Sequence, residues 1–140
     1  MALATLAGGP ARLAKATFAG GCFWCTEAVF KMLRGVKSVT PGYTGGKTDN
    51  PSSNDVCSGT TGHAEAIQID FDPQKITFAD LLHVFFATHD PTTLNQQGAD
   101  IGTQYRSAIF YHDSDQKKAA ATAIQAAQKD FTSKIVTEIT

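Results

Sequence analysis

The chain has 140 residues, of which 42% are apolar and 18% charged, and its formal net charge is −1 at pH 7. This length and apolar content suit one globular domain with a single core and argue against a second domain. The balanced charge argues against a nucleic-acid or anionic-membrane surface, and no apolar run approaches the ~20 residues of a membrane-spanning helix.

Residues 1–14 are predicted to form a loose N-terminal extension. They are rich in alanine and lack acids, but their charges follow the apolar residues, which is the wrong order for a secretion signal. Gly8-Gly9-Pro10 would also break a helix there. The folded domain is therefore expected to cover residues 15–140.

The three cysteines are an odd number, and two of them, Cys22 and Cys25, have C-x-x-C spacing. This pattern fits redox or metal chemistry better than a framework of structural disulfides. Free thiols are typical of a reducing compartment, so we expect a cytoplasmic protein.

Residues 20–27 read Gly-Gly-Cys-Phe-Trp-Cys-Thr-Glu and follow a predicted strand at residues 15–19. The glycines allow a sharp turn and a helical pattern follows, so Cys22 is predicted at or just before a helix N-terminus. The unpaired N–H groups and the helix dipole favour a thiolate there, which makes Cys22 the candidate nucleophile. Cys25 follows at a spacing that brings the two Cα atoms to roughly 5–6 Å, as a disulfide requires.

The helix after Cys22 is predicted to stop near Gly35 and to be followed by a strand at residues 36–43 that Pro41-Gly42 interrupts. A long polar loop covers residues 44–62, and a loop of that length is usually functional. The predicted inward positions of the helix are Val29, Met32, Leu33 and Val36.

The clearest strand is predicted at residues 64–71, where Ile67, Ile69 and Phe71 share one face. Glu65 is in phase with this apolar set. An inward carboxyl near a strand end is desolvated, which favours its protonated form near neutral pH. The phase of the strand is equally compatible with a Glu65 that lies beyond the sheet edge, in water.

The second half of the chain predicts a helix that starts at a capping box of Thr77 and Asp80 and ends at His89-Asp90-Pro91. A polar loop leads to a strand at residues 105–111, a last helix capped by Ser114, and a strand at 135–139. Two apolar stripes are predicted to be core: Phe78, Leu81, Leu82, Phe85 and Phe86 in the first of these helices, and Ala120, Ile124, Ala127 and Phe131 in the last.

The predicted order βαββαβαβ indicates an α+β fold. We expect a two-layer sandwich of ferredoxin-like character, in which a mixed sheet has its helices packed on one side.

Several short segments together resemble one family. In order they are Gly-Gly-Cys-Phe-Trp at 20–24, Gly-Tyr-Thr-Gly-Gly at 42–46, Asn-Pro at 50–51, Val-Cys-Ser-Gly-Thr-Thr-Gly-His-Ala-Glu at 56–65, His-Asp-Pro at 89–91 and Gly-Thr-Gln-Tyr-Arg-Ser-Ala-Ile at 102–109. With these motifs the chain resembles an A-type peptide methionine sulfoxide reductase over most of its length.

The resemblance implies a single catalytic domain over residues 15–140 that reduces the S epimer of methionine sulfoxide and is itself reduced by thioredoxin. It implies no cofactor or metal, a monomer, and oxidised proteins or peptides as substrate. The implied roles are Cys22 as nucleophile, Glu65 as proton donor, Tyr105 as ligand of the sulfoxide oxygen, Asp100 as a residue that orders the site, and Phe23 and Trp24 as the pocket of the substrate methyl group.

The chemistry requires these residue types. A thiolate that attacks a sulfoxide sulfur must displace an oxygen that leaves badly as an anion, so an acid has to protonate it. A buried, neutral Glu65 can do this while the Tyr105 hydroxyl donates a second hydrogen bond. The sulfenic acid left on Cys22 then condenses with a neighbouring thiol.

Two positions depart from the family pattern. Cys25 stands where the common motif has glycine, and its spacing leads us to predict that it resolves the sulfenic acid on Cys22. Cys57 is expected to be a small buried or loop thiol and not a catalyst. Ser53 stands where the family usually has a tyrosine, so one phenol donor to the sulfoxide oxygen is missing.

Two rival functions use the same cysteines. A general dithiol oxidoreductase also carries C-x-x-C at a helix start, but it has no need of Glu65. A non-enzymatic zinc module could combine Cys22, Cys25, Cys57 and His63 by ligand type, although their spacing does not match a familiar zinc finger.

Because Ser53 is too short to replace the phenol, we predict an enzyme weaker than its relatives. Ser53→Tyr should raise the rate of methionine sulfoxide reduction, measured with dithiothreitol as electron source. An unchanged turnover number in this variant would contradict the prediction.

Overall fold

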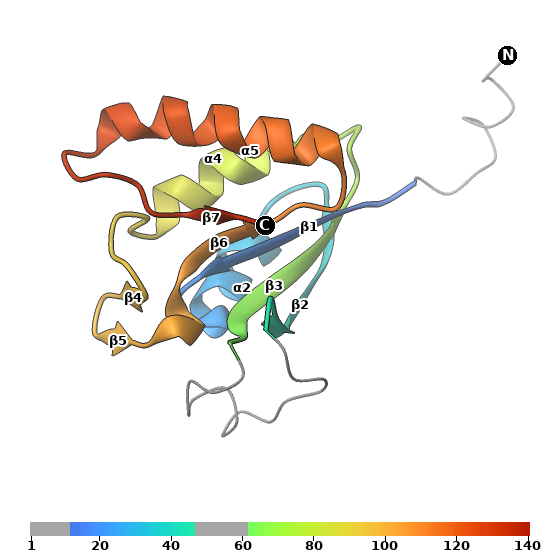
Figure 1. Cartoon of the computed structure of the whole chain (residues 1–140). Helices are drawn as coiled ribbons and strands as arrows, with labels where there is room; N and C mark the ends of the chain where they lie inside the picture. The colour runs from blue at the N-terminus through green and yellow to red at the C-terminus, as the bar shows by residue number, and fades with distance from the viewer. Residues whose placement is uncertain (1–11, 47–61) are drawn as a thin grey trace, which may run out of the picture.

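The computed structural model describes residues 12–46 and 62–140, and within them a five-stranded sheet has the order β2-β3-β1-β6-β7 (Figure 1). Adjacent strands are antiparallel except β6 and β7, which are parallel, so the sheet is mixed. The strands are β1 (Ala14–Gly20), β2 (Val36–Thr44), β3 (Ala64–Phe71), β6 (Ser107–Phe110) and β7 (Glu138–Ile139).

The helices pack on one face of this sheet. They are α2 (Phe23–Lys31), α4 (Phe78–Thr88) and α5 (Ser114–Ala127), and α4 and α5 run side by side over the sheet in Figure 1. Phe18 of β1 shows why α2 and α4 share a face, because its fully buried ring lies 5.7 Å from Phe30 of α2 and 4.9 Å from Phe85 of α4. This arrangement confirms the predicted α+β two-layer sandwich.

Period-two alternation assigns the faces of the central strands. Ile67, Ile69 and Ile109 point to the helices and are fully buried. The opposite face carries a small cluster of Ala19, Ala64, Ala66 and Ala108. Glu65 lies on the helix face with Ile67, as the strand phase predicted.

The first helix is shorter than expected. α2 ends at Lys31, and the N–H groups of Met32, Leu33 and Val36 donate to the carbonyls three residues earlier, so the chain tightens before Gly35 with its φ of +95°. The prediction that Met32 points inward was wrong, because Met32 is 81% exposed. Phe30 is the fully buried residue of this helix.

Pro41 does not interrupt its strand. β2 continues to Thr44 because it is an edge strand of the sheet, where proline can be accommodated without the loss of a ladder hydrogen bond. Its pairing with β3 places Tyr43 directly opposite Glu65.

The segment before and after β6 differs from the prediction in three ways. Tyr105 ends a turn of 3₁₀ helix, η1 (Thr103–Tyr105), because Gly102 and Thr103 accept its closing hydrogen bonds, and β6 begins only at Ser107. The cap of α5 is Asp113 instead of Ser114, with the Asp113 carboxylate accepting from the Gln116 N–H at 2.8 Å. The polar loop contains an unpredicted hairpin of β4 (Gln96–Gln97) and β5 (Asp100–Ile101).

The last described segment is also less regular than expected. A second 3₁₀ turn, η2 (Gln128–Asp130), follows α5, and β7 covers only Glu138–Ile139 of the predicted strand at 135–139. Ile135 is nevertheless buried and belongs to the main core.

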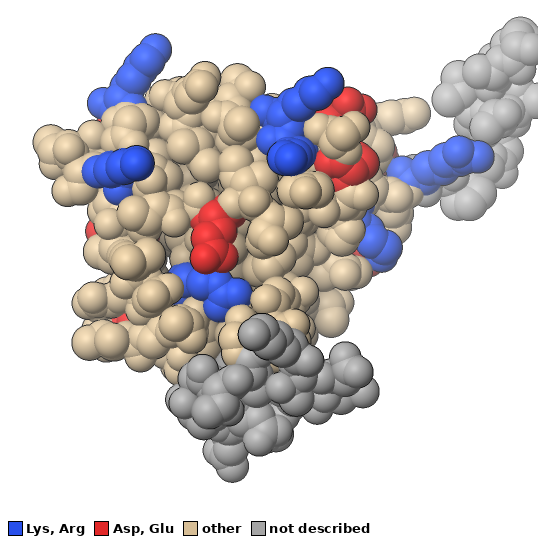
Figure 2. Space-filling model, in the orientation of Figure 1, with Lys and Arg blue, Asp and Glu red and all other residues tan. Residues whose placement is uncertain are grey.

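Charged side chains are scattered over the face shown in Figure 2 and do not form a patch of one sign. In the described part of the chain, the helices are too short or too polar to cross a membrane.

Truncation of Phe18 tests this core. Phe18→Ala removes a fully buried ring that contacts three others, so the free energy of unfolding should fall by about 3–5 kcal/mol, measured by urea denaturation. Met32→Ala is the matched control, because this exposed side chain should change stability by no more than about 0.5 kcal/mol. Equal losses in the two variants would contradict this assignment of the core.

Candidate functional site

Cys22 is the N-cap residue of α2, as the sequence predicted. Its backbone is extended (φ −61°, ψ 122°), and its side chain makes no capping hydrogen bond, so the half-buried sulfur is not used to close the helix. The Cys22 carbonyl accepts the Cys25 N–H at 3.2 Å and the Thr26 hydroxyl at 3.1 Å. These bonds hold the backbone from which the thiol projects.

Cys25 lies one turn further on, is exposed, and contacts Cys22 directly. The charge of the Cys22 sulfur, helped by slight desolvation and by a hydrogen bond that the Cys25 thiol donates to it, raises the pKa of Cys25. Cys25 is therefore kept as a thiol beside Cys22, and neither sulfur is part of a disulfide.

Glu65 points into the site from β3 and is 8% exposed. Its carboxyl accepts the N–H of Phe23, the first residue of α2, and the hydroxyl of Tyr105. Burial raises the pKa of Glu65, and although the Phe23 N–H acts in the opposite direction, the net shift is upward. The structure thus confirms the buried alternative for Glu65 over the solvated one.

Asp100 and Tyr105 approach from the loop that follows α4. The negative charge of Asp100 contributes to the raised pKa of both Glu65 and Cys25, so this carboxylate lies near both groups. The structure therefore brings Cys22, Cys25, Glu65, Tyr105 and Asp100 together from three separate parts of the chain.

Three aromatic side chains form one edge of the site. The Phe23 ring lies 5.5 Å from Trp24, edge to face, and 5.6 Å from Tyr43. Trp24 is 65% exposed, a large apolar surface available to a substrate. Tyr43 is the residue that the sequence reasoning missed as a neighbour of the site, although it belongs to the Gly-Tyr-Thr-Gly-Gly motif; only its position opposite Glu65 reveals it.

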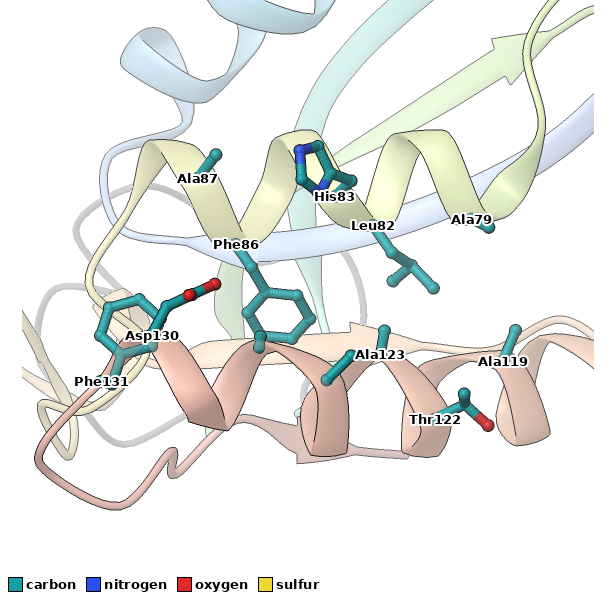
Figure 3. A pocket seen from close by; sticks show the side chains of 12 residues that line it. Ala79, Leu82, His83, Phe86, Ala87, Ala119, Thr122, Ala123, Asp130 and Phe131 are labelled. Carbon is teal, nitrogen blue, oxygen red and sulfur yellow. The ribbon is translucent and has the colours of Figure 1, made fainter.

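A cavity of about 280 Å³ lies against the two cysteines. It is lined on one side by α2 and on the other by the end of α4 and the β4–β5 hairpin, and its lining includes Cys22, Cys25, His89, Gln97 and Asp100. A larger cavity of about 720 Å³ runs between α4 and α5 (Figure 3). It contains no candidate catalytic residue and is lined mainly by apolar side chains such as Leu82, Phe86 and Phe131.

His89 lines the smaller cavity as a neutral ring. Burial lowers the pKa of His89. Its Nδ1–H donates to the Phe85 carbonyl, and its Nε2 accepts from the Ser107 hydroxyl at 2.8 Å. Ser107 in turn lies 2.7 Å from the Thr137 hydroxyl, so the imidazole is held by a partly buried chain of hydrogen bonds.

Ser53 and Cys57 lie outside the described residues, so their predicted roles stay predictions. His63, the fourth ligand of the rival zinc module, is buried, and its Nδ1 accepts the Gly46 N–H at 3.1 Å. Among residues 12–46 and 62–140, no cluster of three metal-ligating side chains is present.

The arrangement combines a free thiol at a helix start, a second thiol beside it and a buried carboxyl with a raised pKa. Such a site can support thiol-dependent reduction of a substrate that must be protonated.

Comparison with known proteins agrees with this class. The family model "Peptide methionine sulfoxide reductase" matches residues 14–140. Proteins named peptide methionine sulfoxide reductase MsrA are 61% identical in Erwinia tasmaniensis and 56% identical in Sulfolobus acidocaldarius, each over 124 residues that cover 89% of this chain and 70% of the relative.

Solved structures show the same likeness. Mxr1 from Saccharomyces cerevisiae in reduced form has a TM-score of 0.86 at 40% identity, covering 92% of this chain and 76% of Mxr1. Methionine sulfoxide reductase A of Corynebacterium diphtheriae has a TM-score of 0.88 at 32% identity, covering 94% and 66%. Mxr1 in complex with Trx2 has a TM-score of 0.68 at 29% identity, covering 91% and 75%.

The chain therefore belongs to the peptide methionine sulfoxide reductase family, in its MsrA branch. It is an oxidoreductase that reduces methionine sulfoxide.

The raised pKa of Glu65 predicts a pH-dependent stability difference. The folded state holds this proton more tightly than the unfolded state, so the contribution of Glu65 to stability falls as pH rises from the ordinary glutamate pKa through the raised one. Glu65→Gln removes this pH-dependent contribution to the free energy of unfolding. Its free energy of unfolding should therefore increase relative to wild type as pH rises above the ordinary glutamate pKa, measured by urea denaturation.

Other groups whose pKa changes on folding do not affect this comparison. The lowered pKa values of Asp70 and His89 make both proteins more stable as pH rises, and they cancel in the difference between the two curves. A difference between variant and wild type that stays constant as pH rises would contradict a raised Glu65 pKa.

Proposed function

We propose that this enzyme reduces the S epimer of methionine sulfoxide in oxidised proteins, with Cys22 as nucleophile, Glu65 as proton donor and thioredoxin as reductant. The observation that carries the proposal is the position of Glu65. Its carboxyl is hydrogen-bonded to the N–H of the residue that follows Cys22, so Glu65 and Cys22 meet at the same helix end. A general dithiol oxidoreductase has no use for such a group.

In the first step the Cys22 thiolate attacks the sulfoxide sulfur. Glu65 gives its proton to the sulfoxide oxygen, so that the oxygen never has to carry a full negative charge. The Tyr105 hydroxyl donates to Glu65 in this structure, and in the proposed step it donates to the sulfoxide oxygen. Transfer of the hydroxyl group to Cys22 then releases the thioether of methionine and leaves a sulfenic acid.

Recognition of the substrate is assigned to Phe23 and Trp24. Their mutually perpendicular rings offer an apolar surface next to Cys22, which suits the methyl group on the substrate sulfur. Asp100 orders the site through its charge, since it favours the protonated form of Glu65 before the substrate binds.

In the second step Cys25 resolves the intermediate. Its sulfur attacks the sulfenic sulfur of Cys22, a disulfide forms, and the hydroxyl group leaves as water with the thiol proton. The hydrogen bond between the two side chains supports this pairing. A dithiol reductant then restores both thiols, and the structure of Mxr1 in complex with Trx2 supports thioredoxin in this role.

We further infer that the enzyme acts as a monomer in the cytoplasm. The described site takes all its residues from one copy of the chain, so a second copy is not needed to complete it. The cycle depends on a reduced thiol partner, which a reducing compartment supplies.

Two variants test the assignment of the chemical step. Cys22→Ser should abolish reduction of a peptide that contains the S epimer, whichever reductant is supplied. Glu65→Gln should lower the turnover number by about 10²–10⁴-fold, because the general acid is lost. Glu65→Gln with turnover close to wild type would favour the general dithiol oxidoreductase.

The role of Cys25 is tested separately. In wild-type enzyme treated with substrate alone, mass spectrometry should show a Cys22–Cys25 disulfide. Cys25→Ser should keep dithiothreitol-supported turnover and lose most of the thioredoxin-supported turnover. A Cys22–Cys57 disulfide or a stable sulfenic acid in the wild type would rule Cys25 out.

A further inference from the structure

The side chain of Gln97 holds the β4–β5 hairpin against the end of α4. Its Oε1 accepts the Asp90 N–H at 2.8 Å, and its Nε2 donates to the Asp90 carbonyl at 2.7 Å. The amide therefore pairs with both backbone groups of one residue, as a neighbouring strand would. This pairing fixes the hairpin relative to the His89-Asp90-Pro91 corner.

The stem of the same side chain packs on the turn that precedes the nucleophile. Gly21 is buried and has a φ of +95°. A Cβ at Gly21 would lie 2.6 Å from Gln97 Cγ and 2.8 Å from Gln97 Cβ, which is far inside van der Waals contact. Gln97 thus occupies the space that a side chain at position 21 would need, directly beside Cys22.

Gln97 is also paired with a charged residue of the site. In the hairpin register it lies opposite Asp100, whose carboxylate acts on Glu65 and Cys25. Gln97 and Asp100 line the same cavity as the two cysteines. Gln97 belongs to the hairpin that carries Asp100. Its side chain therefore joins this hairpin to the Gly21–Cys22 turn and to Asp90, just beyond the end of α4.

We propose that Gln97 is a positioning residue that holds the Gly21–Cys22 turn and the Asp100 hairpin in one fixed relation. The inference rests on the proposed role of Cys22 as nucleophile. Gln97 does not touch the reacting atoms; it acts by keeping the Cys22 sulfur and the acidic groups at the distance that attack and proton transfer require.

The chemistry of glutamine fits this role. The two bonds to Asp90 need one acceptor and one donor, so a glutamate would face the Asp90 carbonyl with a second oxygen and lose a hydrogen bond. Methionine has a stem of similar length, so Gln97→Met retains the packing on Gly21 and removes only the amide. Alanine removes both features.

The test measures kcat, KM and the reactivity of Cys22 in the full chain. With a methionine sulfoxide peptide and dithiothreitol, Gln97→Ala should lower kcat by about tenfold to a hundredfold, with KM within about twofold of wild type. Gln97→Met should recover part of that loss. Alkylation of Cys22 by iodoacetamide, followed by mass spectrometry, should slow in the order wild type, Met, Ala.

Gln96→Ala is the matched control in the same hairpin. The Gln96 side chain donates to the Gly98 carbonyl at 3.0 Å, within the hairpin itself, and is not part of the cavity lining. This variant should keep kcat and Cys22 alkylation at the wild-type values. A purely structural role for Gln97 would lower the melting temperature of its variants and leave the alkylation rate of their folded form unchanged.

Specific outcomes would overturn the proposal. They are a kcat within about twofold of wild type in Gln97→Met and Gln97→Ala, or equal losses in Gln96→Ala and Gln97→Ala. If Gln97→Ala does not fold, the Met variant decides between the same outcomes. Activity retained by Cys22→Ser would refute the proposed function itself, whereas an inactive Cys22→Ser with normal Gln97 variants would refute only the positioning role.

Discussion

The hydrogen bond from the Phe23 N–H to the Glu65 carboxyl is the contact on which the site depends. A helix leaves its first N–H groups without partners, and here the N-cap side chain of Cys22 does not satisfy them. Glu65 satisfies one of them from a neighbouring strand of the sheet. The same bond therefore satisfies a helix-end N–H without using the Cys22 side chain, and it brings an acid to the start of the helix that Cys22 caps.

In this arrangement, opposing effects act on the pKa of Glu65. The Phe23 N–H and the Tyr105 hydroxyl favour the carboxylate, whereas burial and the charge of Asp100 favour the neutral acid. Burial is the largest effect, so the pKa of Glu65 is raised. A raised carboxyl pKa reduces the stability of the fold as pH rises above the ordinary glutamate pKa.

The loop after α4 is held in place by few but well-connected side chains. Arg106, next to Tyr105, donates to the carbonyls of Thr103 at 2.8 Å and Gly62 at 2.9 Å and pairs with Glu138 at 3.1 Å. It thereby joins η1, the start of β3 and the last strand. These bonds hold the chain around Tyr105 in place.

The sequence by itself determined the local features of this protein: the α+β order, the strand at 64–71 with Glu65 in phase, and Cys22 at a helix start. Period-two alternation, capping residues and glycine turns are local signals, so short stretches of sequence carry them. The sequence did not predict the early end of α2 or the hairpin at Gln96–Ile101, because weak local preferences there yield to packing. Only the tertiary structure placed Tyr43 opposite Glu65 and Gln97 on Gly21, since strand pairing and contacts between distant segments have no local signal.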